Sequence, residues 1–407
     1  MAANTENTTT SPAHRNIDFW KYWMGQTISN LGSSITLFAL PLLVYKLTGS
    51  ALNLGITTAA EMLPYLLFGL LLGAWADRVD RKRMMIGTDI ARMLNIAIIP
   101  LLAILGVLNV WEIYAIGFIH STLTICFESG QFAAIPRLVK QDDLVTANGR
   151  IQASYSAASV MGPLLAGLLV LAMPLATVML FDALSFLISA ISLGLIKISF
   201  NENKDEKKEP TSIFQDVTEG LRYVLKHPVL RNISIMMALV NFVGITTFAQ
   251  LVLFARQRLF ANDTQISLLY SAGSIGIVIL SLLAGTLRKR WSFSKVALGA
   301  LMLEGLLTIV FAFLRWYWLA VPLWAVMSGL GILFNINTGS LRQAIVPNHM
   351  LGRVISIASV LAWSAIPLGS LLGGFLIEKT KNVSLVYAII GILVFLIPLT
   401  FSFTALG

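Results

Sequence analysis

Six ionisable side chains lie within long apolar stretches of the sequence. They are Glu61, Asp89, Arg92, Glu128, Asp182 and Glu304. A charge in an apolar membrane environment costs several kcal/mol unless it is paired or hydrated, so such residues often bind protons, ions or substrates. Asp89 and Arg92 are three residues apart on one helical face and can form an ion pair, which favours a structural role. The other carboxylates are candidates for binding a proton or a cationic ligand.

The composition predicts the elements that hold these residues. Of the 407 residues, 57% are apolar and 12% are charged, whereas soluble domains carry about 25% charged residues. A helix needs about 20 apolar residues to cross a bilayer. We predict an all-α polytopic membrane protein with twelve spans, at residues 19–45, 51–76, 84–107, 111–135, 150–173, 175–197, 230–256, 264–287, 294–314, 317–343, 353–377 and 383–404.

Two polar segments divide the chain. Residues 198–229 include a run of charged residues and proline at 203–210, which cannot bury enough apolar surface to cross a bilayer. Residues 1–18 are rich in Thr and Asn and lack the apolar core of a signal peptide. We therefore expect an N-terminal tail (1–18), an N-terminal half (19–197), a linker (198–229) and a C-terminal half (230–407).

The basic residues alternate in density along the chain. The amino terminus and the loops after even-numbered spans hold 22 of the 29 Lys and Arg residues, whereas the loops after odd-numbered spans hold six. Cytoplasmic loops carry the excess of basic residues. This distribution predicts cytoplasmic termini and a cytoplasmic linker, so the net charge of +9 reflects membrane orientation and not binding of nucleic acid. One cysteine, Cys126, excludes a disulfide framework.

The two predicted halves share sequence features at a constant spacing. Gly73 and Gly285 close the second and eighth spans at an offset of 212, and Pro136 and Pro347 follow the fourth and tenth spans at an offset of 211. An internal repeat in a membrane protein indicates a transport path between the repeats. We therefore expect two similar six-helix halves.

The loop after the second span carries a specific motif. Residues 73–83, Gly-Ala-Trp-Ala-Asp-Arg-Val-Asp-Arg-Lys-Arg, resemble the loop between helices 2 and 3 of the major facilitator superfamily, although Asp80 stands where that family most often has glycine. The aspartate can accept charge-assisted hydrogen bonds at a neighbouring helix end. The resemblance implies a conformational gate formed by Gly73, Asp77, Arg78, Arg81 and Lys82; a simple cytoplasmic anchor is the alternative.

Further stretches resemble one branch of that superfamily. Residues 47–51, 135–139 and 343–347 are similar to the drug, macrolide and siderophore exporters. In the fifth span, Gly162, Pro163 and Gly167 resemble the antiporter motif, with alanine in place of one glycine. Proline removes a backbone hydrogen bond and glycine permits close packing, so this segment can bend against a neighbouring helix. The resemblance favours export over import.

The resemblance also ranks the candidate site residues, because helices 1, 4, 7 and 10 of that fold line a central cavity and helices 3, 6, 9 and 12 lie outside. Glu128 and Glu61 become the first candidates for proton coupling. Asp89 and Asp182 come next, and Glu304 is expected on an outer helix. The polar and aromatic residues expected to line a cavity for an amphipathic ligand are Gln26, Asn30, Tyr65, Thr124, Asn241, Phe242, Gln250, Trp324 and Asn335.

The sequence thus predicts a secondary exporter of drug-like or siderophore-like small molecules, driven by proton antiport in the inner (plasma) membrane of a bacterium. We expect a monomer that needs no cofactor or metal. The alternatives are an importer or facilitator of the same fold and, from another class, a membrane-embedded enzyme or sensor. The sequence contains no zinc, nucleophile-elbow or phosphate-loop motif, which argues against an enzyme and against ATP as the energy source.

Overall fold

The structure is a computed structural model that describes residues 12–76, 79–140, 143–201 and 213–406. Throughout these ranges the regular secondary structure is helical. Twelve helical segments are long and apolar enough to cross a membrane, which confirms the predicted number of spans. Each span occupies nearly the predicted part of the sequence because the length of its apolar stretch determines it.

The N-terminal half contributes six spans. The sixth span is divided between a short helix, α6, and the longer α7, and the first five spans are continuous helices. The helices are α1 (Pro12–Thr48), α2 (Ala51–Ala76), α3 (Arg81–Ile104), α4 (Val110–Leu138), α5 (Leu144–Ala172), α6 (Leu175–Val178) and α7 (Leu180–Gly194).

The C-terminal half contributes the other six spans and is preceded by a helix outside the spans, α8 (Ile213–Lys226). A π-helical turn, η2, opens the ninth span. The remaining elements are α9 (Pro228–Ala249), α10 (Leu251–Arg258), α11 (Asp263–Arg290), η2 (Ser294–Leu298), α12 (Gly299–Phe313), α13 (Tyr317–Ile345), α14 (Asn348–Trp363), α15 (Ala365–Thr380) and α16 (Val383–Phe401).

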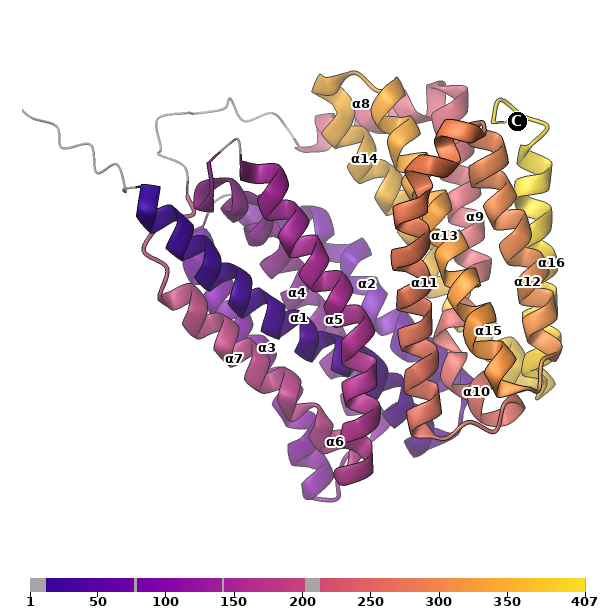
Figure 1. Ribbon diagram of the computed structural model, residues 1–407, viewed down its shortest axis with the longest axis horizontal. Coiled ribbons are helices and arrows are strands. Elements are labelled where there is room, and N and C mark those ends of the chain that lie inside the picture. Colours follow the sequence, from indigo (N-terminus) through magenta and orange to yellow (C-terminus); the bar gives the residue numbers. More distant parts are fainter. Residues whose placement is uncertain (1–11, 77–78, 141–142, 202–212, 407) are drawn as a thin grey trace, which may run out of the picture.

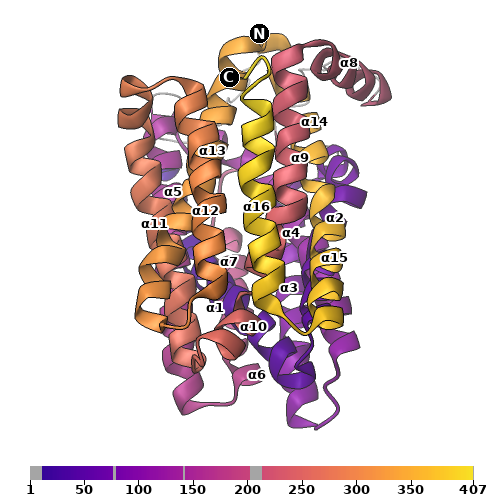
Figure 2. The same cartoon turned by 90° about the vertical axis from the view of Figure 1, so that its right-hand side faces the viewer.

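Two helix pairs join the halves: α5 packs against α11, and α2 packs against α15. The ribbons of the two halves lie close together near α6 and α10 and diverge towards α8 (Figure 1). The view from the side shows the C-terminal half in front, with α9, α12, α15 and α16 running between these two ends (Figure 2). Most of the described polar contacts between the halves lie near α10, at the end of the molecule opposite α8. Further along the pair of α5 and α11, the Ser271 hydroxyl donates to the Val160 carbonyl at 2.9 Å.

Besides the sixth, the seventh and eleventh predicted spans are interrupted in the structure. The seventh ends at Ala249, and α10 begins after Gln250, whose Nε2 donates a hydrogen bond to the Ala51 carbonyl of the other half at 2.7 Å. The eleventh breaks at Ser364, between α14 and α15. Pro367 lies in the first turn of α15, and its missing N–H leaves one carbonyl of the preceding turn without a helical partner.

The predicted linker contains α8, which packs on α14. Val224 of α8 is buried in a cluster with Met350 and Val354 of α14, and Leu221 and Tyr223 pack against it. The helix has 14 residues and is apolar on the side that faces α14. A helix this short is stable only when it packs against other parts of the protein. The linker is therefore helical over residues 213–226 and rests on the C-terminal half.

Candidate functional site

A polar cavity of about 290 Å³ lies within the N-terminal half. Side chains from α1, α2, α3, α4 and α5 line it, including carboxylates, an arginine, a histidine and amides. Most of the polar residues predicted for this half are among them. The polar and charged side chains that line this N-terminal cavity are Gln26, Ser29, Asn30, Ser33, Ser34, Thr36, Glu61, Tyr65, Arg92, His120, Ser121, Thr124, Glu128, Gln131 and Tyr155.

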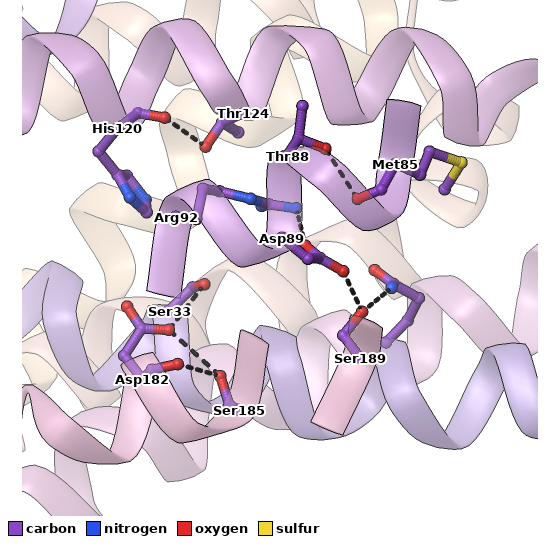
Figure 3. A network of polar contacts seen from close by, with 11 residues as sticks. Ser33, Met85, Thr88, Asp89, Arg92, His120, Thr124, Asp182, Ser185 and Ser189 are labelled. Carbon is purple, nitrogen blue, oxygen red and sulfur yellow. Dashed lines mark hydrogen bonds and ion pairs between the residues drawn. The ribbon is translucent and has the colours of Figure 1, made fainter. Parts of the chain in front are cut away.

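Asp89 and Arg92 of α3 form the predicted ion pair, and both are buried. The second carboxylate oxygen of Asp89, Oδ2, accepts a hydrogen bond from the Ser189 hydroxyl at 2.6 Å, and that hydroxyl accepts one from Gln26 Nε2 at 2.8 Å (Figure 3). These contacts connect α3 with α7 and α1. A buried ion pair is compensated only when further hydrogen bonds satisfy its oxygens, and Asp89 meets that condition.

The Arg92 guanidinium lies between two aromatic rings. Its Cζ atom is 4.2 Å from the ring centroid of Phe127 on α4 and 4.6 Å from that of Phe186 on α7. Both rings present their π systems to the cation, which stabilises a desolvated positive charge. Arg92 also lines the N-terminal cavity, a position that the sequence did not single out because the pair had been assigned to structure alone.

Asp182 lies in the first turn of α7 and is fully buried. Its Oδ2 accepts a hydrogen bond from the Thr36 hydroxyl at 2.6 Å, and its Oδ1 accepts from Ser33 and Ser185, each at 3.3 Å. The carboxylate thus joins α7 to α1, and the amino end of a helix favours a negative charge. Figure 3 shows the contacts of Asp182 with Ser33 and Ser185 beside the contacts that Asp89 makes with Arg92 and Ser189.

Glu61 and Glu128 differ from these two aspartates. Both line the N-terminal cavity, and in the described part of the chain no hydrogen bond or ion pair involves their carboxylates. The nearby His120 also lines the cavity, and its Nδ1 is buried without a partner. Groups that have no fixed partner are available to bind a proton or a ligand, because no existing contact has to break.

A second cavity, of about 280 Å³, lies between the two halves. Ser34, Leu37, Ser159 and Pro163 contribute its wall from the N-terminal half, and the rest comes from α9, α11, α12 and α13. Trp324, which we predict from the sequence to line a cavity, lines this central one. Glu304 also lines it, although it belongs to α12 and was expected outside.

Four other residues predicted to line a cavity lie elsewhere. Asn241 Nδ2 donates to the Ala362 carbonyl at 3.0 Å, and Phe242 lines a separate apolar pocket among α9, α15 and α16. Gln250 is buried at the break between α9 and α10, and Asn335 of α13 is exposed and lines neither of the two cavities. Their helical faces depend on bends and rotations that the local sequence does not specify.

The segment that resembles the antiporter motif lies where α5 passes between α1 and α11. A β-carbon added at Gly162 would lie 2.3 Å from the Ser34 β-carbon, and one added at Gly167 would lie 2.7 Å from the Ser267 β-carbon. Pro163, between the two glycines, lines the central cavity. The glycines therefore permit close helix contacts both within the N-terminal half and across to the C-terminal half.

The gate motif is described only in part. Asp77 and Arg78 lie outside the described residues, and Gly73 lies near the end of α2. Lys82 Nζ donates to the Ile196 carbonyl at 2.5 Å, and Arg81 Nη1 donates to the Phe200 carbonyl at 3.3 Å. Carbonyls that follow the end of a helix attract cations, so the basic side chains hold the loop against the chain that follows α7.

Asp80, where this sequence departs from the motif, is the N-cap of α3. Its Oδ1 accepts a hydrogen bond from the Arg83 backbone N–H at 2.9 Å. An aspartate at this position satisfies one of the free N–H groups of the first turn. The departure therefore has a local structural reason.

The halves are joined by polar contacts at the end opposite α8. Glu378 of α15 accepts hydrogen bonds from the Ser50 hydroxyl at 3.0 Å and from the Ala51 N–H at 3.2 Å, so a carboxylate of one half caps α2 of the other. Lys46 Nζ lies 2.5 Å from Asp263 Oδ2, and Arg256 pairs with the same carboxylate. We call the contacts of Lys46, Ser50, Ala51, Asp263 and Glu378 the inter-half contact.

Twelve spanning helices in two halves, with a cavity between them, define a membrane transporter of small molecules. A major facilitator family model described as transmembrane secretion effector matches residues 7–406. The chain belongs to that family, and its similarity to macrolide and multidrug efflux proteins supports the predicted drug and macrolide exporter branch of the superfamily. The predicted fold, membrane class and family are thereby confirmed, and the chain is a transporter and not an enzyme.

Relatives resemble the chain over most of its length, and a solved structure shares its fold. Macrolide efflux protein A of Streptococcus pyogenes is 25% identical over 367 residues, which cover 89% of this chain and 90% of that protein. The multidrug efflux pump Tap of Mycolicibacterium fortuitum is 26% identical and covers 84% of this chain and 85% of the pump. Among solved structures, the nucleoside transporter NupG superposes with a TM-score of 0.79 at 13% identity, covering 95% of this chain and 98% of that one.

Proposed function

We propose that this transporter exports amphipathic organic molecules, macrolide-like or siderophore-like, in exchange for protons. The observation that carries the proposal is the N-terminal cavity, where the carboxylates of Glu61 and Glu128 stand without partners beside Arg92. The efflux names of the relatives support the direction of transport and the class of substrate. The mixed polar and aromatic lining suits ligands that combine an apolar body with a few polar groups.

The proposal includes an orientation. The N-terminal tail (1–18) and the linker (198–229) face the cytoplasm, and the two halves (19–197 and 230–407) cross the bacterial inner membrane as a monomer. The distribution of Lys and Arg supports this arrangement. The inter-half contact then faces outward, and the diverging end, next to α8, faces the cytoplasm.

Alternating access follows from this arrangement. To open outward, the halves must break the inter-half contact, in which Glu378 caps α2 and Lys46 pairs with Asp263. The gate motif, with Asp77, Arg78, Arg81 and Lys82, then closes the cytoplasmic side. Gly162, Pro163 and Gly167 let α5 move against α1 and α11 while close packing is kept. Each state is thus stabilised by polar contacts at the closed end.

Proton coupling requires one carboxylate to take up a proton in one state and release it in the other. Glu128 is the first candidate because it is exposed on the cavity side of α4, and Glu61 of α2 is the second. Arg92, held between its two rings, supplies a fixed positive charge in the same cavity. A fixed cation favours the ionised carboxylate and therefore assists proton release.

Transport by purified protein in liposomes with an imposed pH gradient tests the proposal. Macrolides, dyes and siderophores serve as substrates. Replacing the coupling residue by glutamine (Glu128→Gln or Glu61→Gln) removes a titratable group while keeping its size, so accumulation against a gradient should vanish and downhill exchange should persist. Glu112→Gln, at the first turn of α4 and outside both cavities, is the matched control and should accumulate substrate normally.

Three outcomes would contradict parts of the proposal. Accumulation that survives in both single variants and in the double variant assigns Glu61 and Glu128 to structure and makes Asp89 and Asp182 the next candidates. Substrate movement that is independent of the pH gradient indicates a facilitator. Movement in the same direction as protons indicates an importer.

A further inference from the structure

The central cavity carries one acidic residue and no basic one among the side chains that line it. Glu304 is that acidic residue, and Phe248, Tyr270 and Trp324 provide aromatic surfaces around it. The cavity of about 280 Å³ approaches the lower end of the range of small-molecule sites, roughly 300 Å³. Besides this one negative charge, the lining combines apolar and aromatic side chains with five neutral hydroxyl residues, Ser34, Ser159, Thr247, Ser274 and Ser328.

The Glu304 carboxylate has no partner in the described part of the chain. It extends from α12 against Gly331 of α13, where an added β-carbon would lie 3.5 Å from Oε2 and 3.8 Å from Oε1. Oε2 is buried without a hydrogen bond. The neighbouring Thr308 hydroxyl donates to the Glu304 backbone carbonyl at 2.8 Å and not to its carboxylate. A carboxylate that has no partner is costly to bury, so a cation that reaches it from the cavity is favoured.

We propose that Glu304 and the aromatic wall of the central cavity bind the positively charged group of an organic monocation, such as a protonated amine or a quaternary ammonium. This inference rests on the proposed transport of amphipathic compounds, and it assigns their charged group to the C-terminal half. The carboxylate supplies the counter-charge, and the ring of Trp324, Tyr270 or Phe248 supplies a π face that attracts cations. The apolar body of the ligand then occupies the space towards Leu37 and Met327.

The chemistry of the lining favours an organic cation over a metal ion. Calcium takes six to eight oxygen ligands and magnesium needs an octahedral set, whereas Glu304 is the one carboxylate of this cavity. Tertiary and quaternary ammonium groups need fewer polar partners, since their methyl and methylene groups contact aromatic faces directly. Because the cavity offers a single carboxylate, it can balance one positive charge and therefore favours a singly charged compound.

Binding of two probes of similar shape tests the inference without any gradient. Tetraphenylphosphonium is a hydrophobic monocation, and triphenylphosphine oxide is a neutral analogue; both are titrated calorimetrically into the full-length protein in lipid nanodiscs. Glu304→Gln should weaken binding of the cation by about tenfold or more, because a desolvated charge pair is lost. The ratio of cation affinity to neutral affinity should fall accordingly. Glu304→Asp, which keeps the charge, should restore most of that ratio.

The matched control is Glu112→Gln, which removes one negative charge outside the cavity and should leave the ratio unchanged. An unchanged ratio in Glu304→Gln would overturn the inference, and so would equal weakening of both probes, which indicates a change of shape and not of charge. If Glu304→Gln does not fold, a protection experiment on the wild-type protein tests the inference instead. Tetraphenylphosphonium should slow carbodiimide modification of Glu304, located by peptide mass spectrometry, and no slowing would reject the site.

The two proposals fail independently. Loss of pH-driven accumulation in Glu128→Gln concerns coupling in the N-terminal half and does not require cation binding at Glu304. Cation binding that depends on Glu304 would stand even if transport proved independent of protons. Normal coupling together with a charge-independent affinity would reject the cation site alone.

Discussion

Arg92 of α3 and Glu304 of α12 occupy corresponding positions in the two halves, since they are separated by 212 residues, the same offset as Gly73 and Gly285. The repeat therefore places opposite charges at equivalent points. In the N-terminal half, Asp89 and two aromatic rings compensate the arginine. In the C-terminal half, the position equivalent to Asp89 is the buried Leu301, and the glutamate is left without a partner.

This difference separates two uses of buried charge. Charges that are paired and hydrogen-bonded hold helices together, as Asp89, Arg92 and Asp182 connect α3, α7 and α1. A charge that has no partner contributes no such contact and is retained at a cost. The comparison therefore predicts that removing the paired charges of Asp89, Arg92 or Asp182 lowers stability, whereas removing the unpaired charge of Glu304 does not.

The largest effect is expected for Arg92→Ala. The substitution leaves Asp89 as an uncompensated buried charge and removes the contacts with Phe127 and Phe186, so we expect a loss of about 3–5 kcal/mol of unfolding free energy. A large fall in the melting temperature of the purified protein in detergent would report it. Adding Asp89→Asn to Arg92→Ala should recover part of the loss, because the unpaired charge is then gone. Unchanged stability of the single variant would show that the pair is not structural.

The twelve spans were predictable because each depends on a single local property, a run of about 20 apolar residues. The breaks at Gln250 and Ser364 were not. The helix is interrupted at Gln250, whose side chain donates a hydrogen bond to the Ala51 carbonyl of the other half. The two residues are 199 positions apart in the sequence. This is a tertiary contact, and no sequence pattern within the seventh span predicts it.

The residues of the candidate site could be predicted where their depth within an apolar span is enough to identify them. Glu61 and Glu128 were selected because carboxylates are rare in apolar spans, and the structure places both on one cavity; their roles remain a prediction. Glu304 was ranked low because its helix lies outside in related folds. Its side chain lines the central cavity with the carboxylate against Gly331 of α13, and this depends on how α12 packs on α13, which is a tertiary feature.

An intermediate effect is expected for Asp182→Ala. The hydroxyl groups of Thr36 and Ser33 lose their acceptor, whereas that of Ser185 keeps the backbone carbonyl of residue 182 at 2.7 Å. The cost of unsatisfied buried donors is about 1–3 kcal/mol. Differential scanning fluorimetry on Asp182→Ala and Asp182→Asn compares the two. The asparagine keeps one acceptor oxygen and should lie between wild type and alanine. Equal stability of all three proteins would remove Asp182 from the structural network and strengthen its candidacy for proton coupling.

The smallest effect on stability is expected for Glu304→Gln, measured on the same protein and by the same fluorimetry. Oε2 of Glu304 is buried and unbonded, so the wild-type protein bears the cost of that group without a compensating contact. Glutamine keeps the volume of the side chain and removes the charge. The unfolding free energy of the variant should therefore lie within about 0.5 kcal/mol of the wild-type value, and its melting temperature should be equal or higher. The wild type should gain more stability than Glu304→Gln when the monocation is added at the same concentration, because a ligand stabilises the state that binds it in proportion to its affinity. A clear loss of stability in Glu304→Gln without ligand would mean that the carboxylate already has a stabilising partner, and the contrast with Arg92 would then disappear.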